Sequence, residues 1–468
     1  MGYLYIAAAH KSSGKTSVSV GLTAALVKRG LAVQTFKKGP DYIDPLWLAR
    51  AAGKPCYNLD FFTQTRNEIA ATFANNMSDA DIGLIEGNKG LFDGVDVEGT
   101  DSNAALATML AAPVVLVIDT GGMTRGIAPL IRGYLDFDPE VNICGVILNK
   151  VGGARHESKL RAALERYTSA EVVGAIGRDK ALEIPERHLG LVPANEASGP
   201  TAADTMISRL AGAVSAGVDL DRLIEIASSD NLPLETTGAA SQSQTRSSQT
   251  KSNVRIAIAR DAAFGFYYPD DLEAFEQAGA ELIPFDTLND SHLPAADGLF
   301  IGGGFPETHL DALSTNHSLL KDVRQALAAG MPAYAECGGL MYLARNIQWR
   351  SKSGDMVGAV PADVLVGNRP QGRGYMVVEE SGNSPWLPIP DAAAEGVGVH
   401  EFHYARLENL AENTVFAHRV LRGTGIDGNH DGLVINNLLA GFAHHRNTVA
   451  NPWVERFVTF VREKSGMT

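Results

Sequence analysis

Residues 9–16 of the chain read AHKSSGKT and end in Gly-Lys-Thr, the ending of a P-loop that binds nucleotide phosphates. Such a loop turns consecutive backbone N–H groups toward the phosphates, so it needs small residues and a helix start behind it. Ser13 and Gly14 would belong to this backbone cradle. Lys15 would reach the outer phosphates of ATP, and Thr16 would hold Mg²⁺. The loop begins with alanine in place of glycine, but its apolar run and following helical pattern favour an ATP site over a chance Gly-Lys-Thr.

Two further segments combine carboxylates with lysines at the ends of apolar runs. FKKGPDYIDP covers residues 36–45, and IEGNKGLFDG covers residues 85–94. Ligands bind at the carboxyl ends of parallel strands and Mg²⁺ prefers oxygen ligands, so these segments are candidates for a metal and substrate site. Solvated loop residues are the alternative for each one alone, but lysines and carboxylates behind separate strands favour a site. The charged residues are Lys37, Lys38, Asp41, Asp44, Glu86, Lys89 and Asp93.

The segment AYAECGGLMYL, residues 333–343, joins an apolar run to a helical apolar pattern through Glu-Cys-Gly-Gly. This is the layout of a nucleophile elbow, a sharp strand-to-helix turn that projects a reactive side chain. Cys337 would be the nucleophile, and the N–H group of Gly338 would stabilise an oxyanion. The glycine turn in FIGGGFPE would donate a second N–H group, from Gly303 or Gly304. The pattern predicts acyl transfer by a thiol.

A thiol nucleophile needs a base, and four histidines near the end of the chain are candidates. AGFAHHRN contains His444 and His445, and HEFHYA contains His400 and His403. A cysteine and a histidine far apart in sequence and close in space are typical of thiol acyl transfer. The residues alone do not choose between these histidines.

The elements that position these residues read as two α/β domains. In the first half, apolar runs such as YLYIAAA, LAVQTF, DIGLIEG, APVVLVIDT, ICGVILN and VVGAIG alternate with helical patterns. That alternation predicts a doubly wound parallel sheet covered on both faces. Residues 234–253, rich in Ser, Gln and Thr, predict a flexible linker. We therefore expect domains at 1–233 and 254–468, the second of them also doubly wound.

Composition narrows the class of protein. The chain has 468 residues and a formal net charge of −14, with no local basic stripe, which argues against a nucleic-acid partner. Three scattered cysteines favour a reducing compartment, and Cys56 and Cys144 read as ordinary core residues. No apolar run is long enough to span a membrane. We expect a cytoplasmic enzyme without a membrane partner; a homodimer is compatible with the sequence.

The motifs occur in one order along nearly the whole chain, and together they resemble the cobyrinic acid a,c-diamide synthase family. The matching motifs are AHKSSGKT, FKKGPDYIDP, CYNLD, EGNKGLFDG, GVILNKV, GGGFPE, ECGGLMYL, GRGY and HEFHY. The resemblance implies a P-loop amidoligase domain similar to dethiobiotin synthetase, fused to a flavodoxin-like class I glutamine amidotransferase domain. His10 and Lys11 depart from the commoner P-loop, and we expect them to report which acceptor binds. This departure leans toward the siroheme amidase branch of the family.

The resemblance also implies roles in the first domain. Lys15 and Thr16 would bind the phosphates of ATP and Mg²⁺, and Asn149 would read adenine. Further metal ligands would be Asp44 and Glu86. The residues that would line the carboxylate site of a tetrapyrrole substrate are Asp41, Tyr42 and Asp93.

In the second domain the resemblance implies a glutaminase. Cys337 would be its nucleophile and His444 its base, with Gly304 and Gly338 as the oxyanion hole. His445 remains an alternative base, because Gly-Phe-Ala-His replaces the Ser-Tyr-x-His of the family. No glutamate lies two residues after His444, so the resemblance implies a Cys-His pair instead of a full Cys-His-Glu triad.

The predicted function is therefore ATP- and glutamine-dependent amidation of tetrapyrrole carboxylates. The a and c acetates of cobyrinate, or of its cobalt-free relative hydrogenobyrinate, are the first choice of acceptor. Siroheme or sirohydrochlorin is the alternative. A P-loop regulatory ATPase with a non-catalytic second domain, and a tetrapyrrole-binding chaperone, are the alternatives of another class.

Overall fold

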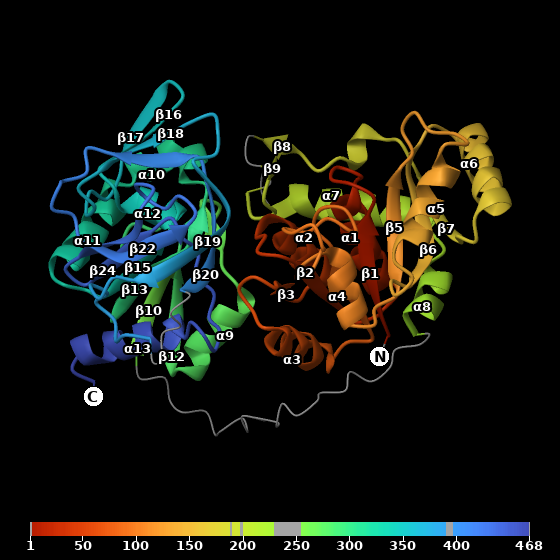
Figure 1. Cartoon of the computed structure of the whole chain (residues 1–468). Coiled ribbons are helices and arrows are strands. Elements are labelled where there is room, and N and C mark those ends of the chain that lie inside the picture. The colour runs from red at the N-terminus through yellow and green to blue at the C-terminus, as the bar shows by residue number, and fades with distance from the viewer. Residues whose placement is uncertain (1, 188–189, 197–199, 229–253, 390–395, 468) are drawn as a thin grey trace. The chain divides into compact units, whose positions relative to one another are not determined.

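A computed structural model of the chain describes residues 2–187, 190–196, 200–228, 254–389 and 396–467. The chain divides into two compact units, residues 1–240 and 241–468 (Figure 1). The predicted linker, residues 234–253, lies outside the described residues. Among the described helices, none is long and apolar enough to cross a lipid bilayer.

The N-terminal unit is built on a seven-stranded sheet in which every pairing is parallel. In sheet order the strands are β3 (Cys56–Leu59), β2 (Val33–Lys38), β4 (Ile82–Glu86), β1 (Gly2–Ala8), β5 (Val114–Asp119), β6 (Ile143–Val151) and β7 (Val172–Gly177). Each of the six predicted strand runs lies in this sheet, which confirms the α/β class. Two short strands, β8 (Glu186–Arg187) and β9 (Gly190–Leu191), form a separate ladder.

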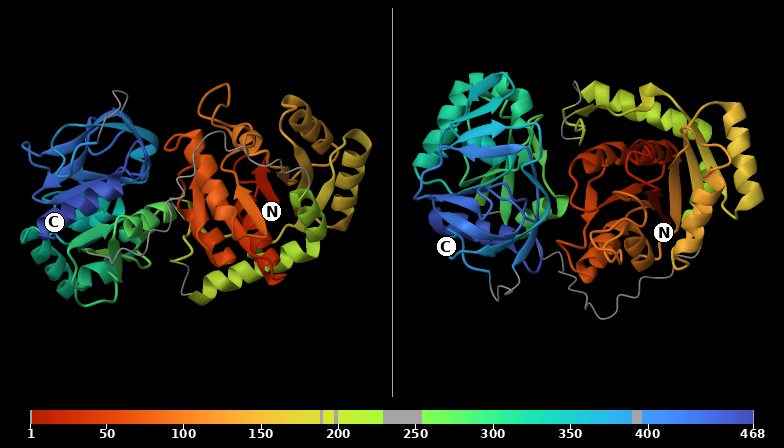
Figure 2. Two further views of the ribbon diagram at one scale, coloured as in Figure 1. Left: turned by 90° about the horizontal axis from the view of Figure 1, so that it is seen from below. Right: turned by 45° about the horizontal axis from the view of Figure 1, so that its top comes forward.

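Helices cover both faces of this sheet. They are α1 (Lys15–Lys28), α2 (Ile43–Ala52), α3 (Arg66–Met77), α4 (Asn103–Met109), α5 (Ile127–Phe137), α6 (Ala154–Tyr167), α7 (Pro200–Gly217) and α8 (Leu220–Ser228). The side chains of β1 contact a different helix layer on each face of the sheet, because successive side chains of a strand point to opposite faces. Leu4 and Ile6 pack with α1, α2, α7 and α8, whereas Tyr3 and Tyr5 pack with α3, α4, α5 and α6. Figure 2 shows α7 beside α1, against which it packs.

The C-terminal unit contains a nine-stranded mixed sheet. In sheet order the strands are β12 (Ala280–Phe285), β10 (Val254–Ala259), β13 (Gly298–Ile301), β15 (Ala333–Glu336), β24 (Leu438–Gly441), β23 (His430–Ile435), β22 (Phe416–Arg422), β19 (Gly372–Glu380) and β20 (Val397–His403). The pairings from β12 to β24 are parallel, and those from β24 to β20 are antiparallel. The doubly wound pattern therefore ends at β24, where an antiparallel extension continues the sheet.

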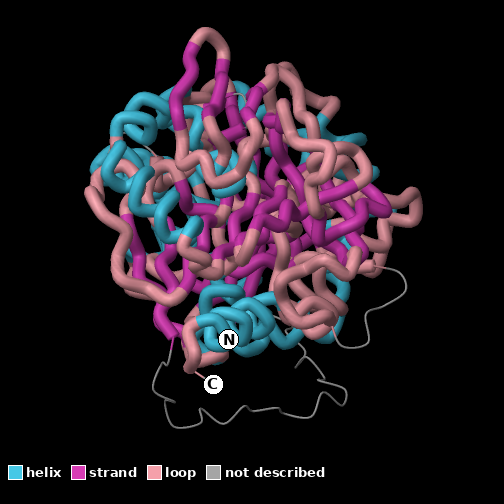
Figure 3. The backbone as a smooth tube through the Cα atoms, turned by 90° about the vertical axis from the view of Figure 1, so that its left-hand side faces the viewer, coloured by secondary structure: helices cyan, strands magenta, loops and turns pink. Residues whose placement is uncertain are grey.

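Smaller elements complete this unit. A second sheet contains β17 (Lys352–Asp355), β16 (Asn346–Trp349), β18 (Asp363–Val366) and β21 (Ala405–Glu408), and a short ladder pairs β11 (Phe264–Phe266) with β14 (Gly303–Gly304). The helices are α9 (Pro269–Gln277), α10 (Leu310–Thr315), α11 (His317–Ala328), α12 (Gly338–Leu343) and α13 (Trp453–Lys464). In Figure 3 strands run through the middle of the unit, and the β16–β17 hairpin stands at its top.

Candidate functional site

The predicted P-loop lies between β1 and α1, at the carboxyl end of a central strand. Gly14 has φ of 84°, a left-handed conformation that favours glycine. A Cβ atom at Gly14 would lie 2.2 Å from Nδ2 of Asn149. That amide donates a hydrogen bond of 2.9 Å to the carbonyl oxygen of Ser13. Asn149, predicted to read adenine, therefore also holds the backbone of the loop from the end of β6.

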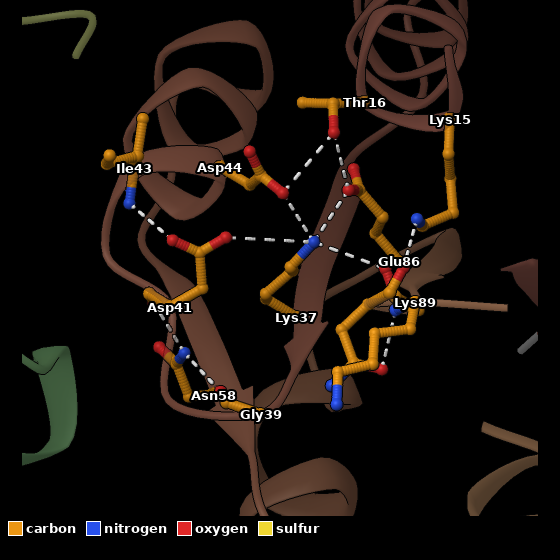
Figure 4. A network of polar contacts seen from close by, with 12 residues as sticks. Lys15, Thr16, Lys37, Gly39, Asp41, Ile43, Asp44, Asn58, Glu86 and Lys89 are labelled. Carbon is orange, nitrogen blue, oxygen red and sulfur yellow. Dashed lines mark hydrogen bonds and ion pairs between the residues drawn. The ribbon is translucent and has the colours of Figure 1, made fainter. Parts of the chain in front are cut away.

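A buried lysine occupies the centre of the carboxylate cluster behind this loop (Figure 4). Nζ of Lys37, on β2, lies 2.5 Å from Oδ2 of Asp44 and 2.7 Å from Oε1 of Glu86. Oδ2 of Asp41 is 3.9 Å away. The hydroxyl of Thr16 donates to Glu86 at 2.9 Å and lies 3.3 Å from Asp44. We call Thr16, Lys37, Asp44 and Glu86 the carboxylate cage.

The charges of the cage shift the pKa values of its members. Burial raises the pKa of Asp44, but the Lys37 ammonium outweighs burial and lowers that pKa to about 2. Burial lowers the pKa of Lys37, but the carboxylates, Asp44 first, outweigh it and raise that pKa above its usual value. Burial and the nearby charge of Lys37 lower the pKa of Lys15 to about 8. Lys37 thus stays protonated at neutral pH, whereas Lys15 loses its proton near pH 8.

The donors of the cage fit Mg²⁺, which prefers carboxylate and hydroxyl oxygens. Oε2 of Glu86 is buried and has no hydrogen-bond partner among the described residues, so one oxygen of the cage is uncommitted. The cage offers two carboxylates and one hydroxyl. No cluster of three or more His, Cys, Asp or Glu side chains suited to a metal occurs in the described part of the chain. A divalent ion here would therefore complete its shell with phosphate or water oxygens.

Of the predicted acceptor residues, Asp41 and Tyr42 directly precede α2, the helix that carries Asp44 of the cage. Asp41 accepts a hydrogen bond of 2.9 Å from the backbone N–H of Ile43 at the start of α2, and Tyr42 is buried. Asp93 is exposed, and its carboxylate accepts from the N–H of Gly90 at 3.0 Å. Two lysines of these segments are engaged by carboxylates of the protein itself. Lys37 is committed to the cage, and Lys38 is buried with Asp101 3.8 Å away.

A cavity of about 520 Å³ opens on the other side of the P-loop, at the ends of β5, β6 and β7. Its lining residues are His10, Asp119, Gly121, Met123, Lys150, Arg178 and Glu183. Nζ of Lys150 lies 2.8 Å from Asp119 and donates to the carbonyl oxygen of Ser12 at 3.1 Å. His10 therefore lines this cavity together with Asp119 and Lys150.

In the C-terminal unit, Cys337 lies at a sharp turn between β15 and α12. It has φ of 46° and ψ of −100°, a conformation that a non-glycine residue rarely adopts. Its N–H donates to the carbonyl oxygen of Gly441 at 2.7 Å. A Cβ atom at Gly338 would lie 2.9 Å from the backbone nitrogen of Gly304. The two glycines predicted to form an oxyanion hole therefore lie against each other beside the thiol.

The structure places one of the four candidate histidines at the thiol. His444 follows the end of β24 by three residues and forms a hydrogen bond with Cys337. Nδ1 of His444 lies 3.4 Å from Oε2 of Glu336. A Cβ atom at Gly303 would lie 2.5 Å from Cε1 of His444, so only glycine there leaves room for the ring.

The pKa of His444 reflects these neighbours. Burial alone lowers it, but the hydrogen bonds and charges of Cys337 and Glu336 outweigh burial and raise the pKa to about 10. The imidazolium form of His444 is therefore favoured at neutral pH.

The remaining histidines have other surroundings. Nδ1 of His445 lies 3.2 Å from the amide of Asn451, and burial lowers its pKa well below the usual value. His403 stacks on Phe442 with a centroid distance of 3.9 Å. His400 pairs with His444 through the backbone, and burial lowers its pKa to about 3.

Two parts of this arrangement are absent from the sequence-based prediction. Lys37, at the centre of the cage, was predicted only as one of the charged residues of its segment, because sequence spacing does not say which way a strand side chain points. Glu336 was read only as part of the elbow. Its position directly before a candidate nucleophile was the one available signal.

Comparison with known proteins agrees with this division of the chain. Residues 4–192 match the family described as the CobQ/CobB/MinD/ParA nucleotide binding domain. Residues 255–450 match the CobB/CobQ-like glutamine amidotransferase domain. The fold and site thus define a two-domain protein with a nucleotide-binding unit and a glutamine amidotransferase unit.

Full-length relatives narrow the class. The cobyrinate a,c-diamide synthase of Magnetococcus marinus is 45% identical over 469 residues, which cover 99% of this chain and 98% of the relative. The protein of the same name from Methanosarcina acetivorans is 40% identical over 459 residues, covering 94% and 91% of the two chains. The chain belongs to the cobyrinate a,c-diamide synthase family of glutamine-dependent amidating ligases.

Proposed function

We propose that this protein uses ATP and glutamine to convert the a and c acetate groups of cobyrinate into carboxamides. One observation carries the proposal: a single chain of this family holds both a P-loop backed by the carboxylate cage and a Cys337–His444 pair at an elbow. The first site suits phosphoryl transfer to a carboxylate, and the second suits release of ammonia from an amide. The first site would supply an activated carboxylate, and the second would supply the ammonia that reacts with it.

The amidoligase site would activate the acceptor. A carboxylate is a poor acyl donor because its leaving group would be oxide. Transfer of the γ-phosphoryl group of ATP converts the carboxylate into an acyl phosphate, from which phosphate can leave. Lys15 would neutralise charge on the transferred group, and Thr16, Asp44 and Glu86 would hold Mg²⁺. When bound, Mg²⁺ supplies charge neutralisation at the phosphates.

Binding of the nucleotide would use both sides of the P-loop. The backbone of Ser13 and Gly14 would contact the phosphates. The cavity beside Asn149 would take the nucleoside, with Asp119 and Lys150 at its wall. Asp41 lies 3.9 Å from Lys37, on the cage side, where we place the acceptor, and Tyr42 and Asp93 would line the same site.

The glutaminase site would supply ammonia. The thiolate of Cys337 attacks the side-chain amide carbon of glutamine, and the N–H groups of Gly304 and Gly338 stabilise the oxyanion. The C–N bond then breaks as His444 gives its proton to the leaving ammonia, which leaves a thioester. Water hydrolyses the thioester to glutamate and restores the thiol. Ammonia displaces phosphate from the acyl phosphate, and the product is the carboxamide.

A comparison of nitrogen donors tests this assignment. Amidation of cobyrinate is measured with ATP and Mg²⁺, using either glutamine or ammonium chloride, for wild type and Cys337→Ala. The proposal predicts that the variant loses glutamine-dependent amidation and keeps the ammonia-dependent reaction. Equal activity of both proteins with glutamine would refute the role of Cys337. No amidation with either donor would favour a regulatory ATPase or a chaperone.

A further inference from the structure

Glu336, the residue directly before the nucleophile, has a carboxylate that faces the histidine of the glutaminase site. Oε2 of Glu336 lies 3.4 Å from Nδ1 of His444, and both side chains are buried. Hydrogen bonds of catalytic groups in ligand-free structures are often this long. The imidazole thus has the thiol of Cys337 and a carboxylate as its neighbours.

The other oxygen of Glu336 is fixed by two donors. The hydroxyl of Tyr334 donates to Oε1 at 2.7 Å, and the backbone N–H of His445 donates to the same atom at 2.9 Å. One donor comes from the strand that carries Glu336, and the other comes from the residue after His444. These bonds leave Oε2 directed at Nδ1 of His444.

The strained turn explains how neighbouring residues reach one ring. Side chains of successive strand residues normally point to opposite faces of a sheet. Cys337 directly follows β15 with φ of 46°, and this conformation redirects its side chain. Glu336 and Cys337 can therefore both contact His444. Strain of this kind persists where surrounding structure fixes it, as the 2.7 Å bond between Cys337 N–H and the Gly441 carbonyl does here.

The position two residues after His444, where a full triad has its acid, carries the opposite charge. Arg446 is buried and its guanidinium lies 2.6 Å from Asp270, so it belongs to a separate ion pair. A carboxylate is therefore present at the histidine, although it comes from another place in the chain.

We infer that Glu336 is the positioning residue of the glutaminase: its carboxylate holds the Nδ1–H form of His444 and orients the ring toward Cys337. This inference rests on the proposed function, because it concerns the same thiol. A carboxylate at Nδ1 fixes the tautomer in which Nε2 can accept the thiol proton, and it stabilises the imidazolium that forms. The site is then a Cys-His-Glu triad whose acid and nucleophile are sequence neighbours.

The substitution Glu336→Gln tests the inference. The glutamine amide can still accept from Tyr334 and His445 through its oxygen, but its NH₂ group then faces Nδ1 and favours the wrong tautomer. We expect kcat for glutamine hydrolysis to fall by about 10²–10⁴-fold with little change in KM. The midpoint pH for alkylation of Cys337 by iodoacetamide should rise, because the thiolate–imidazolium pair loses its supporting charge. Ammonia-dependent amidation should be retained.

Glu401→Gln is the matched control. Glu401 is also buried, accepts two backbone N–H groups (from Thr424 and Gly425) and lies 3.6 Å from a histidine, His403. The substitution Glu401→Gln changes a buried carboxylate to an amide in the same unit but away from the thiol. We therefore expect kcat and the alkylation profile to stay near wild type. Tyr334→Phe removes one bond to Oε1 and keeps the charge. We expect Tyr334→Phe to lower kcat below wild type, by less than Glu336→Gln does. If Glu336→Gln does not fold, wild-type kcat and a wild-type alkylation profile in Tyr334→Phe would overturn the inference.

The outcomes separate this inference from the proposed function. If wild type hydrolyses glutamine and Glu336→Gln matches it in kcat and alkylation profile, the Cys-His pair acts alone and the inference is wrong. If wild type hydrolyses no glutamine, the proposed function fails, and the alkylation profile, which needs no glutamine, still tests the role of Glu336. Equal shifts in Glu336→Gln and Glu401→Gln would indicate a general effect of buried charge and would also overturn the inference.

Discussion

Nζ of Lys37 lies 2.7 Å from Oε1 of Glu86, and both side chains are buried. A cation of the protein itself therefore occupies the group of oxygens that suits Mg²⁺. Removing one partner of a buried ion pair is costly because the other charge is left unpaired. We expect Lys37→Met to lower the free energy of unfolding by about 3–5 kcal/mol. Added Mg²⁺ should recover more stability in this variant than in wild type, because the ion would neutralise Asp44 and Glu86.

Chemical denaturation with and without Mg²⁺ measures this difference, and Lys38→Met is the control. Lys38 is equally buried on the same strand, but its partner is Asp101, outside the cage. Its loss should lower stability without a larger response to Mg²⁺. An identical Mg²⁺ response in both variants would show that the cage does not take the ion.

The second prediction concerns pH and the affinity for ATP. Burial lowers the pKa of Lys15 to about 8, so the free protein loses this positive charge as pH rises through 8. Bound phosphates favour the charged form, so affinity must decrease above pH 8. We expect Kd for ATP to increase about tenfold between pH 7 and pH 9. Titration calorimetry measures it, and Lys15→Met should bind weakly with no such pH dependence. A flat wild-type profile would contradict the prediction.

The third prediction concerns the residue that links β6 to the P-loop. The Asn149 amide donates to the Ser13 carbonyl at 2.9 Å, and a hydrogen bond of this kind contributes about 1 kcal/mol. We expect Asn149→Ala to weaken ATP binding by about fivefold or more, since 1 kcal/mol corresponds to that factor. Binding of a triphosphate without a base separates two roles. An effect on both ligands indicates support of the loop, and an effect on ATP alone indicates base reading. Unchanged binding of both ligands would refute any role of Asn149 in nucleotide binding.

The fourth prediction concerns the space for the histidine. A Cβ at Gly303 would lie 2.5 Å from Cε1 of His444, so Gly303→Ala must displace the ring. A misplacement of about 1 Å can cost a factor of about 100 in rate. We expect glutaminase activity to fall by about that factor, with ammonia-dependent amidation retained. Gly133→Ala, at a glycine with no atom within 4 Å of the added Cβ, is the control and should keep both activities. Full glutaminase activity of Gly303→Ala would contradict the placement of His444.

Much of the N-terminal sheet could be predicted because its strands are long, apolar runs. The four-residue edge strand β3 is shorter, and it appeared in the sequence only as the motif CYNLD. The antiparallel half of the C-terminal sheet was also not predicted, because alternating strands such as β19 give a weaker signal than buried parallel ones.

The functional site also has a part that the sequence predicts and a part that only the fold reveals. Gly-Lys-Thr and Glu-Cys-Gly-Gly are local signals, so the loop and the elbow could be located from sequence. Which charged side chains meet depends on tertiary contacts. Lys37 turns into the cage while its neighbour Lys38 faces Asp101, and only the fold brings His444 to Glu336, over a hundred residues away in the chain. Spacing in the sequence does not carry that information.

An isotope label can show whether this one chain moves the amide nitrogen of glutamine onto cobyrinate. The most direct measurement is mass spectrometry of cobyrinate after incubation with the protein, ATP, Mg²⁺ and glutamine labelled with ¹⁵N in its side-chain amide. We expect a product with labelled carboxamides at the a and c acetates, dependent on ATP and absent with Cys337→Ala. Unmodified cobyrinate, with labelled sirohydrochlorin in a parallel reaction, would contradict cobyrinate as the acceptor. No labelled product from either tetrapyrrole would contradict the proposed transfer of nitrogen by this protein.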